Sequence, residues 1–466
     1  MIPKYIRFKG INFILSNYIM TQEKALALLK SGANLFLTGS AGAGKTYVLN
    51  QFIQYLQDAK IHVAITASTG IAATHIKGNT IHSWSGIGIK QIIASKDLEY
   101  LKKTNVYRDQ FNKTKVLIID EISMLHKDQL NSIHQILSYC RDNPMAFGGI
   151  QVVLCGDFFQ LPPIGNYHET SKDKFAFMSD AWVWGEFKIA YLTDQYRQSE
   201  NELNRILEEI RSGKISQNTI DSLNEAKGNT FEKEIEPTKL YTHNVDVDTI
   251  NNKFLENLPG KRRYFKALTK GDKSLVTTLK KSVLTQDNMS LKIGAKVMFV
   301  KNNSEKNYIN GTLGEIIDYS TLGFPVVKTL EGDEITTSLE EWSILNEAGH
   351  PLATYQQVPL RLAWAITVHK SQGMTLDAAE LDLSKTFERG QGYVALSRLR
   401  ALDRLKLLGF NNVALQVDPL ALKADRRFRE LSQILDEETN LDELDVKRKD
   451  FIRKSGGRVL TKLQKD

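Results

Sequence analysis

The chain has 466 residues, a formal net charge of +7 and a pI of about 9.0, and 42% of its residues are hydrophobic. It contains no apolar run long enough to cross a bilayer, and its two cysteines, Cys140 and Cys155, form neither a disulfide framework nor a zinc-binding pattern. These properties exclude an integral membrane protein and a disulfide-stabilised secreted domain, and they predict about two to four domains. The basic charge favours a polyanionic partner, although a basic solvated surface explains it almost as well.

A glycine-rich loop joins the first predicted strand, residues 35–38, to a predicted helix at 47–56. The loop has the spacing G-x-x-x-x-G-K-T, in which glycines turn backbone N–H groups toward a phosphate chain and the helix N-terminus adds positive charge. We expect Lys45 to bind the β- and γ-phosphates of a nucleoside triphosphate and Thr46 to bind Mg²⁺. The predicted nucleotide-binding residues of this loop are Gly39, Ser40, Ala41, Gly42, Ala43, Gly44, Lys45, Thr46 and Tyr47.

Two polar segments follow the second predicted strand, residues 62–66: TASTG begins at Thr66 and TIHSWSG begins at Thr80. Hydroxyl and backbone N–H groups at strand ends suit the phosphates of a nucleic acid. Helix caps and turns use the same groups, so both interpretations stay open. The candidate nucleic-acid contacts here are Thr66, Ser68, Thr80, His82 and Ser83.

The third predicted strand, residues 116–120, is apolar and ends in two carboxylates, Asp120 and Glu121. Phosphoryl transfer needs a metal ligand and a group that orients the attacking water. Asp120 suits Mg²⁺, and Glu121 suits the role of general base. Two exposed acids at a strand end would be unremarkable alone, but the phosphate-binding loop favours the catalytic interpretation.

The fourth predicted strand, residues 151–155, is followed by the sequence GDFFQLPP. The amide of Gln160 can contact a γ-phosphate or its attacking water. Phe158 and Pro162 are candidates for contacts with a nucleic acid, although packing in the core explains the aromatic residues at least as well.

A fifth strand is predicted at 189–193. Apolar strands that alternate with helices predict a parallel sheet covered on both faces, with ligands at the carboxyl ends of its strands.

The second half of the chain repeats this pattern. Strands are predicted at 239–242, 362–367, 379–383 and 404–408, with helices at 248–258 and 392–399. Between them, residues 271–357 contain short strands and turns, which predict a small inserted antiparallel barrel. A second, basic insertion is predicted at 84–112 in the first half, and the tail from residue 411 is predicted to be helical with a solvated face.

Two arginines of the second half are candidates for contacts with the γ-phosphate. Arg197 follows the fifth strand, and Arg398 ends a predicted helix. If both arginines face the phosphate-binding loop, they would act as arginine fingers, which raise the rate of phosphoryl transfer roughly 10³–10⁵-fold. The polar segment 367–375 suits the phosphates of ATP or of a nucleic-acid strand, and its candidates are Thr367, His369, Lys370 and Gly373.

Together these motifs resemble those of the PIF1-type (petite integration frequency) DNA helicases of superfamily one, in the group with RecD-like and Dda helicases. After Gln22 the chain carries, in order, GSAGAGKT, TASTGIAA, TIHSWSGIG, DEISM, GDFFQLPP, LTDQYRQ, TVHKSQGMT and YVALSRLR. The resemblance covers residues 21–408, while the segment at 125–141 matches the family pattern only loosely.

The resemblance implies an α/β fold of two RecA-like domains with parallel sheets. The first domain would comprise residues 1–83 and 113–195, with a wedge insertion at 84–112. The second would comprise residues 196–270 and 358–466, with an SH3-like barrel insertion at 271–357. Gln22 would contact the adenine, and Ser68, His82 and His369 would lie on the DNA side. The residues implied around the γ-phosphate are Gln160, Arg197, Gly373 and Arg398.

The implied activity is ATP- and Mg²⁺-dependent 5′→3′ translocation on single-stranded DNA with duplex unwinding. Forks, G-quadruplexes and RNA–DNA hybrids are expected substrates, in replication, repair, recombination or telomere-like maintenance. We expect a cytoplasmic, nucleoid-associated monomer of bacterial or viral origin, with no membrane partner. The alternatives are a nucleic-acid-binding protein switched by ATP, an RNA helicase of the same superfamily and, least consistent with two α/β halves, a small-molecule kinase.

Overall fold

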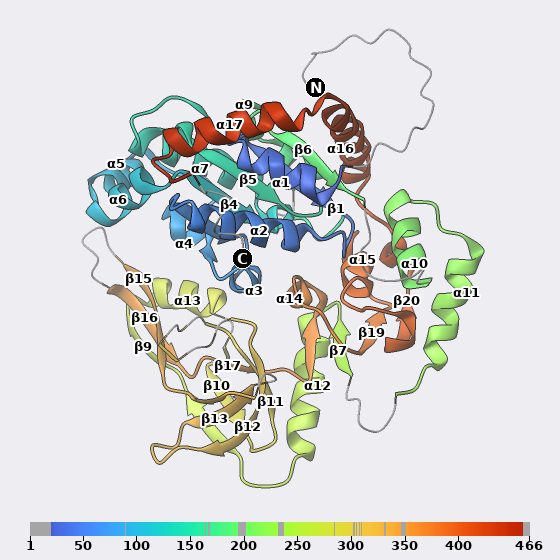
Figure 1. The fold of residues 1–466 in the computed structure, drawn as a ribbon. Coiled ribbons are helices and arrows are strands. Elements are labelled where there is room, and N and C mark those ends of the chain that lie inside the picture. Colours follow the sequence, from blue (N-terminus) through green and yellow to red (C-terminus); the bar gives the residue numbers. More distant parts are fainter. Residues whose placement is uncertain are drawn as a thin grey trace.

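The computed structural model describes residues 20–459, apart from residues 89, 164, 166–167, 194–201, 232–236, 284, 302, 304, 307, 309, 330–331 and 346–350. Arg197, one of the two predicted arginine fingers, lies outside the described residues. Figure 1 shows two α/β parts, one above the other, and a β-rich part beneath the first and beside the second.

The first α/β part is built on a six-stranded sheet in the order β3-β2-β4-β5-β1-β6, in which every neighbouring pair is parallel. This confirms the parallel sheet predicted from the first half of the sequence. The sheet also has a two-residue edge strand that the sequence did not indicate. The strands are β1 (Leu35–Gly39), β2 (Val63–Ala67), β3 (Asn79–Thr80), β4 (Val116–Asp120), β5 (Gln151–Cys155) and β6 (Lys188–Leu192).

Alternating residues of these strands belong to two separate cores, because successive side chains of a strand point to opposite faces of the sheet. Phe36, Leu117 and Leu154 lie in one core, whereas Leu35 and Val116 lie in the other. The helices of this part are α1 (Gln22–Lys30), α2 (Lys45–Asp58), α3 (Gly70–His75), α4 (Ile81–Ser85), α5 (Ser95–Lys103), α6 (Asn105–Lys113), α7 (Lys127–Cys140), α8 (Ser171–Lys174) and α9 (Asp180–Trp184).

The C-terminal helices α16 (Pro419–Glu438) and α17 (Leu441–Lys454) return to the first part, where α16 packs on the edge strand β6 and α17 packs on helix α1 (Figure 1). The Phe428 ring meets the Phe36 ring edge-on with centroids 5.2 Å apart, and the Tyr191 backbone N–H donates to Ser432 Oγ at 2.9 Å. Ile452 is completely buried. The tail is helical with an exposed charged face, as predicted, but the apolar stripes of its two helices pack on the first α/β part rather than on the second, to which residues 358–466 were assigned.

The second α/β part has a parallel sheet in the order β18-β7-β19-β20, as the sequence predicted. Its strands are β7 (Thr238–Tyr241), β18 (Ala365–Thr367), β19 (Ala379–Leu383) and β20 (Leu405–Phe410). Its helices are α10 (Glu202–Ser212), α11 (Gln217–Glu225), α12 (Asn244–Asn257), α14 (Val368–Ser371) and α15 (Gln391–Leu396).

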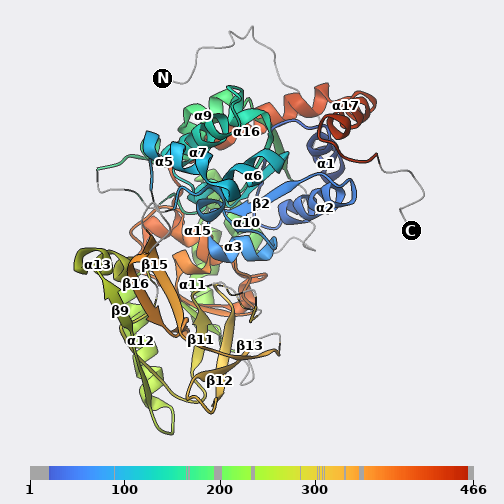
Figure 2. The ribbon, with the colours of Figure 1, turned by 90° about the vertical axis from the view of Figure 1, so that its left-hand side faces the viewer.

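The β-rich part contains antiparallel sheets, as the pattern of short strands predicted. Its strand pairing extends beyond residues 271–357, since β8, β9 and β17 also belong to it. Figure 2 shows this part next to α3, and Asn310 Nδ2 lies 3.0 Å from where a Cβ would stand on Gly70. The elements are β8 (Arg263–Lys266), β9 (Leu268–Gly271), α13 (Lys273–Ser282), β10 (Asn288–Leu291), β11 (Lys296–Phe299), β12 (Leu313–Tyr319), β13 (Pro325–Thr329), β14 (Glu334–Thr336), β15 (Glu340–Leu345), β16 (Pro351–Gln357) and β17 (Leu360–Leu362).

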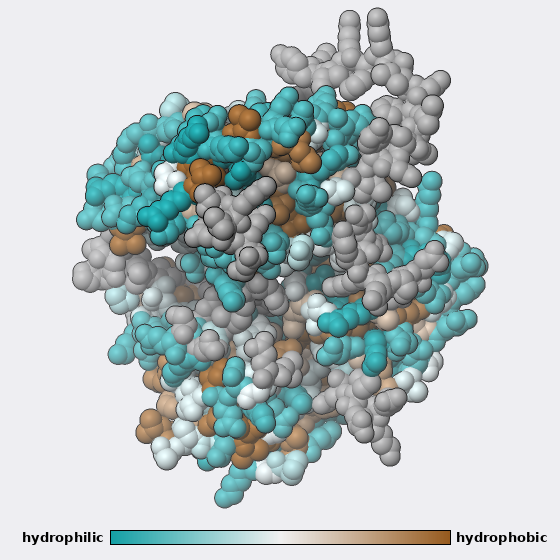
Figure 3. Space-filling model, in the orientation of Figure 1, coloured by the Kyte–Doolittle hydropathy of each residue, from teal (hydrophilic) through white to brown (hydrophobic). Residues whose placement is uncertain are grey.

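Among the described residues, no helix combines the length and the apolar character that a membrane span requires. Figure 3 shows a mainly hydrophilic face with small, scattered apolar groups.

Candidate functional site

The glycine-rich loop connects the end of β1 to the first turn of α2, as predicted. Gly42 and Gly44 have left-handed backbones, with φ of 87° and 85°. Lys45 Nζ donates to the carbonyl oxygens of Gly39 at 2.8 Å and Ser40 at 2.9 Å, so its ammonium group is held over the loop. The loop thus carries a positioned cation at the N-terminus of a 14-residue helix, which is the arrangement that binds phosphates.

The same loop is covered by Gln22 at the start of α1. Its Nε2 donates to the Ala43 carbonyl oxygen at 3.4 Å, and a Cβ added to Gly44 would lie only 2.0 Å from that nitrogen. A side chain at Gly44 would displace the Gln22 amide and would be strained by the left-handed backbone. The predicted neighbours Thr46 and Tyr47 are exposed on the first turn of α2, where a nucleotide can reach them.

The two predicted acidic residues lie at the carboxyl end of β4. Asp120 Oδ1 accepts from the Glu121 backbone N–H at 2.9 Å, and Glu121 has a left-handed backbone with φ of 50° and ψ of 45°. Glu121 Oε2 is buried and has no hydrogen-bond partner among the described residues. Burial and the nearby Asp120 charge raise the pKa of Glu121 to about 7. A carboxyl group with this pKa near neutral pH is suited to proton transfer.

Cations from both halves of the chain act on this carboxylate. The positive charges of Arg398 and Lys45 both oppose the rise in the Glu121 pKa, so both lie within electrostatic reach of it. Arg398 is buried just after α15, and its Nη1 donates to the Met374 carbonyl oxygen at 3.2 Å. The structure therefore brings Lys45, Glu121 and Arg398 together.

The polar segment around Gln372 also reaches this site. Gln372 Nε2 donates to Ser123 Oγ at 3.4 Å across the two halves, and Gln372 opposes the raised pKa of Glu121 through a hydrogen bond. The Oε1 atoms of Gln160 and Gln372 are buried without a partner among the described residues. Buried acceptors without partners suit a bound ligand or water. Gln372 was missed from the sequence, although it lies in the polar segment beside the predicted Gly373.

The predicted nucleic-acid contacts of the first part do not all reach the surface. Ser83 is exposed, His82 is half-buried, and Thr80 caps α4 by accepting from the Ser83 backbone N–H at 3.3 Å. Ser68 lines a hollow of about 460 Å³. Thr66 is completely buried, and its hydroxyl donates to the Ile118 carbonyl oxygen at 2.6 Å within the sheet, so its prediction as a DNA contact is wrong.

Phe158 is also a core residue rather than a DNA contact. It is 5% exposed, and its ring packs against Phe36, Phe177 and Phe428. Of the alternatives that the sequence left open, core packing is the correct one. Pro162, a few residues on, remains partly exposed.

The candidates of the second part gather at the carboxyl end of β18. Thr367 is buried at the end of this strand. His369 and Lys370 lie in α14, where His369 Nε2 is 3.3 Å from Glu388 Oε2. Burial and the neighbouring Arg361 charge lower the pKa of Lys370 to about 8. This end of the sheet thus holds a partly buried cation that an anionic ligand would stabilise.

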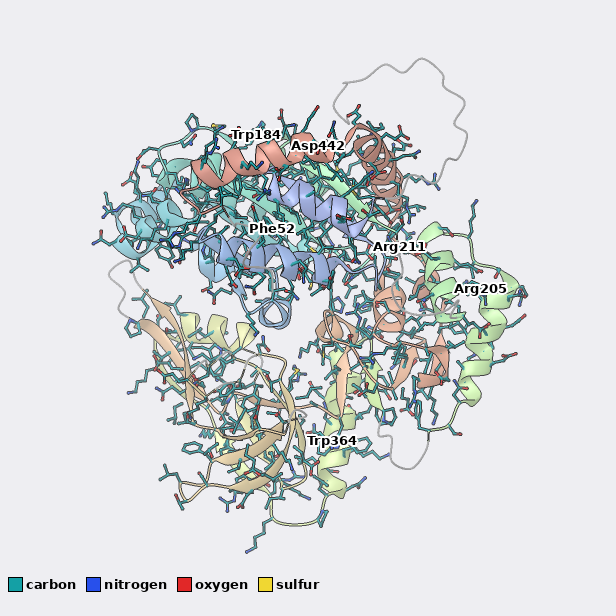
Figure 4. All side chains as sticks on the ribbon, viewed as in Figure 1. Phe52, Trp184, Arg205, Arg211, Trp364 and Asp442 are labelled. Carbon is teal, nitrogen blue, oxygen red and sulfur yellow. The ribbon has the colours of Figure 1, made fainter. Side chains whose placement is uncertain are left out.

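A buried ionic cluster that no sequence motif indicated joins the two halves. Arg211 of α10 is 2% exposed; its Nη1 donates to Asp157 Oδ2 at 2.6 Å and to the Tyr393 hydroxyl at 2.7 Å. Its guanidinium lies 4.4 Å from the centre of the Phe159 ring. Figure 4 shows Arg211 between the two α/β parts. The cluster ties the loop of Gln160 to the helix of Arg398.

Replacing Arg211 by methionine should destabilise the protein strongly, because it leaves the Asp157 carboxylate buried without its cation. We expect a loss of about 3–5 kcal/mol in the free energy of unfolding, measured by urea denaturation. Arg205→Met on the same helix is the matched control: Arg205 forms partly exposed pairs with Glu202 and Glu209. Its loss should cost about 0–1 kcal/mol, and equal losses for both variants would contradict the structural importance of the cluster.

Comparison with known proteins adds independent information. Residues 18–221 match the family of PIF1-like helicases. The ATP-dependent DNA helicase Pif1 of Psychrobacter sp. is 48% identical over 94% of this chain and 75% of its own length. The crystal structure of Pif1 from Candida albicans is similar with a TM-score of 0.80 and 33% identity, covering 90% of this chain and all of that one.

A Pif1 helicase from Bacteroides, crystallised with ADP-AlF3 and single-stranded DNA, is similar with a TM-score of 0.77. It is 31% identical and covers 91% of this chain and 99% of its own. These relatives match the chain across both α/β parts and the β-rich part.

Proposed function

The chain belongs to the PIF1-like helicase family and is an ATP-dependent DNA helicase, and we propose that its two α/β halves hydrolyse one shared ATP and move along DNA by closing and opening around it. The observation that supports this proposal best is the position of Glu121. Its carboxylate lies within electrostatic reach of Lys45 from the first half and Arg398 from the second.

Each residue has a distinct part in the proposed hydrolysis. Lys45 binds the β- and γ-phosphates, and Gln22 contacts the adenine beside the loop that it covers. Thr46 and Asp120 would hold Mg²⁺, which supplies charge neutralisation at the phosphates. Glu121 accepts a proton from the attacking water. The residues proposed around the γ-phosphate are Gln160, Arg197, Gly373 and Arg398.

Closure of the two halves would depend on the γ-phosphate, because Arg398 and the Gln160 loop belong to opposite halves and both contact it. Loss of the phosphate removes their shared partner, and the halves separate. If the halves grip DNA alternately, each cycle advances the strand. The Arg211 cluster would serve as the fixed point of this movement, since it joins both halves through Asp157 and Tyr393.

We propose single-stranded DNA as the track, in the 5′→3′ direction, with forks as substrates and G-quadruplexes and RNA–DNA hybrids as further ones. The Bacteroides relative crystallised with single-stranded DNA supports the track. Contacts with DNA phosphates should dominate binding, so the affinity should depend little on base sequence and strongly on salt concentration. The bacterial relatives support action on the cell's DNA in the cytoplasm, and we propose that the protein acts there as a monomer in replication, repair or recombination.

Unwinding of paired DNA substrates tests this proposal. Two duplexes of the same sequence, one with a 5′ single-stranded tail and one with a 3′ tail, are incubated with ATP and Mg²⁺. We expect strand separation of the 5′-tailed duplex at least about tenfold faster than of the 3′-tailed one. Faster separation of the 3′-tailed duplex would refute the proposed 5′→3′ polarity. ATP hydrolysis without separation of either duplex would favour a nucleic-acid-binding protein that ATP switches. If single-stranded RNA stimulates ATP hydrolysis more strongly than single-stranded DNA does, the protein would instead be an RNA helicase.

A further inference from the structure

Three ring side chains gather at the carboxyl edge of the second sheet. His243 follows β7, His369 follows β18 and Phe387 follows β19, and these three strands are neighbours in the sheet. The Phe387 ring lies 4.9 Å from the His243 ring and 6.3 Å from the His369 ring, with an interplanar angle of 19° to the latter. The topology of a parallel sheet therefore places three rings from distant parts of the sequence side by side.

Phe387 is unusual in this group because its side chain is 58% exposed. Its loop is nevertheless held firmly: Thr386 Oγ1 donates to the Leu383 carbonyl oxygen at 2.8 Å, and Asn411 Nδ2 donates to the Thr386 carbonyl oxygen at 2.8 Å. The Phe387 backbone N–H donates to Gln391 Oε1 at 3.3 Å. An aromatic ring presented to solvent on a fixed loop loses little conformational entropy when a flat partner stacks on it.

The charges around Phe387 favour a nucleic acid rather than an apolar partner. Lys385 Nζ pairs with Asp246 at 3.0 Å, and Glu388 faces His369, so each neighbouring carboxylate has a partner. Lys370 lies beside His369 on α14, which Figure 1 places on the side of the second sheet that faces the first α/β part. An exposed ring two residues after the exposed Lys385 offers a stacking surface for a base and a contact for its phosphate.

We propose that Phe387, supported by His243 and His369, is a stacking platform for one unpaired nucleobase of the DNA strand along which the protein moves. This inference rests on the proposed translocation on single-stranded DNA. Because every base has a flat face, the platform would hold the strand without selecting a sequence. It would give the second half a grip on a base in addition to its contacts with phosphates.

Binding of a fluorescent oligothymidylate of about ten nucleotides tests the platform. Phe387→Ala should weaken binding about 5- to 100-fold, whereas Phe387→Tyr, which keeps the ring, should bind within about threefold of the unchanged protein. A series of oligonucleotides, each with one abasic position, should then locate the stacked base. One position should weaken binding to the unchanged protein, and that penalty should disappear in Phe387→Ala.

Trp184→Ala is the matched control, since Trp184 is 56% exposed in α9 on the far side of the first part (Figure 4) and should not affect DNA binding. Equal affinities of Phe387→Ala and the unchanged protein, or an abasic series that is identical for both, would overturn the platform. If the unchanged protein neither binds nor unwinds DNA, the proposed function fails instead. ATP hydrolysis without DNA and the thermal unfolding midpoint should be the same in all variants.

Discussion

Replacing Lys45 by alanine is expected to abolish ATP hydrolysis and, with it, unwinding. The Lys45 ammonium is the charged group of the phosphate-binding loop, held by the carbonyl oxygens of Gly39 and Ser40. Losing one such positioned group costs on the order of 10²–10³ in kcat. We therefore expect DNA-stimulated ATP turnover to fall at least about a hundredfold, as measured by phosphate release at saturating single-stranded DNA.

The same variant should still bind single-stranded DNA in the absence of ATP, because the loop lies apart from the candidate DNA contacts. Lys45→Arg separates charge from shape: a guanidinium keeps the charge but does not fit the position of an ammonium group. Lys447→Ala, which changes an exposed lysine of α17, controls for the loss of a positive charge. Normal turnover in Lys45→Ala would show that the loop does not bind the ATP used for unwinding.

The parts of this site that the sequence predicted correctly have local causes. A strand, a glycine loop and a helix follow one another within about 25 residues, so their spacing alone places Lys45 at a helix N-terminus. Glu121 directly follows an apolar strand, and Gln160 follows the next apolar strand after a short loop. Because the carboxyl ends of parallel strands meet at one edge of a sheet, the prediction of parallel strands was enough to place the Lys45 loop and Glu121 at the same edge.

The parts that the sequence did not predict depend on contacts between distant segments. No sequence motif singled out Arg211, and only the fold brings Asp157 and Tyr393 to it. The helical, charged pattern of the tail predicted a solvated face, but did not indicate which part of the protein the opposite face of its helices covers. Phe158 and Thr66 stand at strand ends where ligand contacts are expected, yet their side chains point into the protein, which the register of a strand alone does not reveal.

Replacing Glu121 by glutamine should reduce ATP turnover by about 10²–10⁴-fold, which is the usual contribution of general acid–base catalysis, while ATP and DNA binding persist. Glutamine keeps the size of the side chain and cannot accept the proton. Single-turnover hydrolysis and equilibrium binding of ATP separate the two effects. Glu438→Gln, at an exposed position of α16, is the matched control. Unwinding at a normal rate by Glu121→Gln would assign the base to another residue.

The raised pKa of Glu121 also predicts how both activity and stability depend on pH. Only the ionised carboxylate accepts a proton, so kcat/KM should rise about tenfold per pH unit below pH 7 and level off above it. The folded protein favours the protonated form, because the pKa is about 7 instead of the ordinary 4.5. Ionisation therefore costs the folded state stability as pH rises from about 4.5 to 7, and this cost persists at higher pH.

Glu121→Gln removes that titration, so without nucleotide the variant should unfold at a higher temperature than the unchanged protein at pH 8 but at the same temperature at pH 4.5. The difference between the pKa of about 7 in the folded protein and the ordinary value of 4.5 sets an upper limit of about 3 kcal/mol on the gain in the free energy of unfolding. A variant that is less active and more stable only above neutral pH would show that the buried charge is retained for catalysis at the expense of stability. An equal gain at both pH values would mean that the amide simply packs better, and that burial of the charge does not explain the raised pKa.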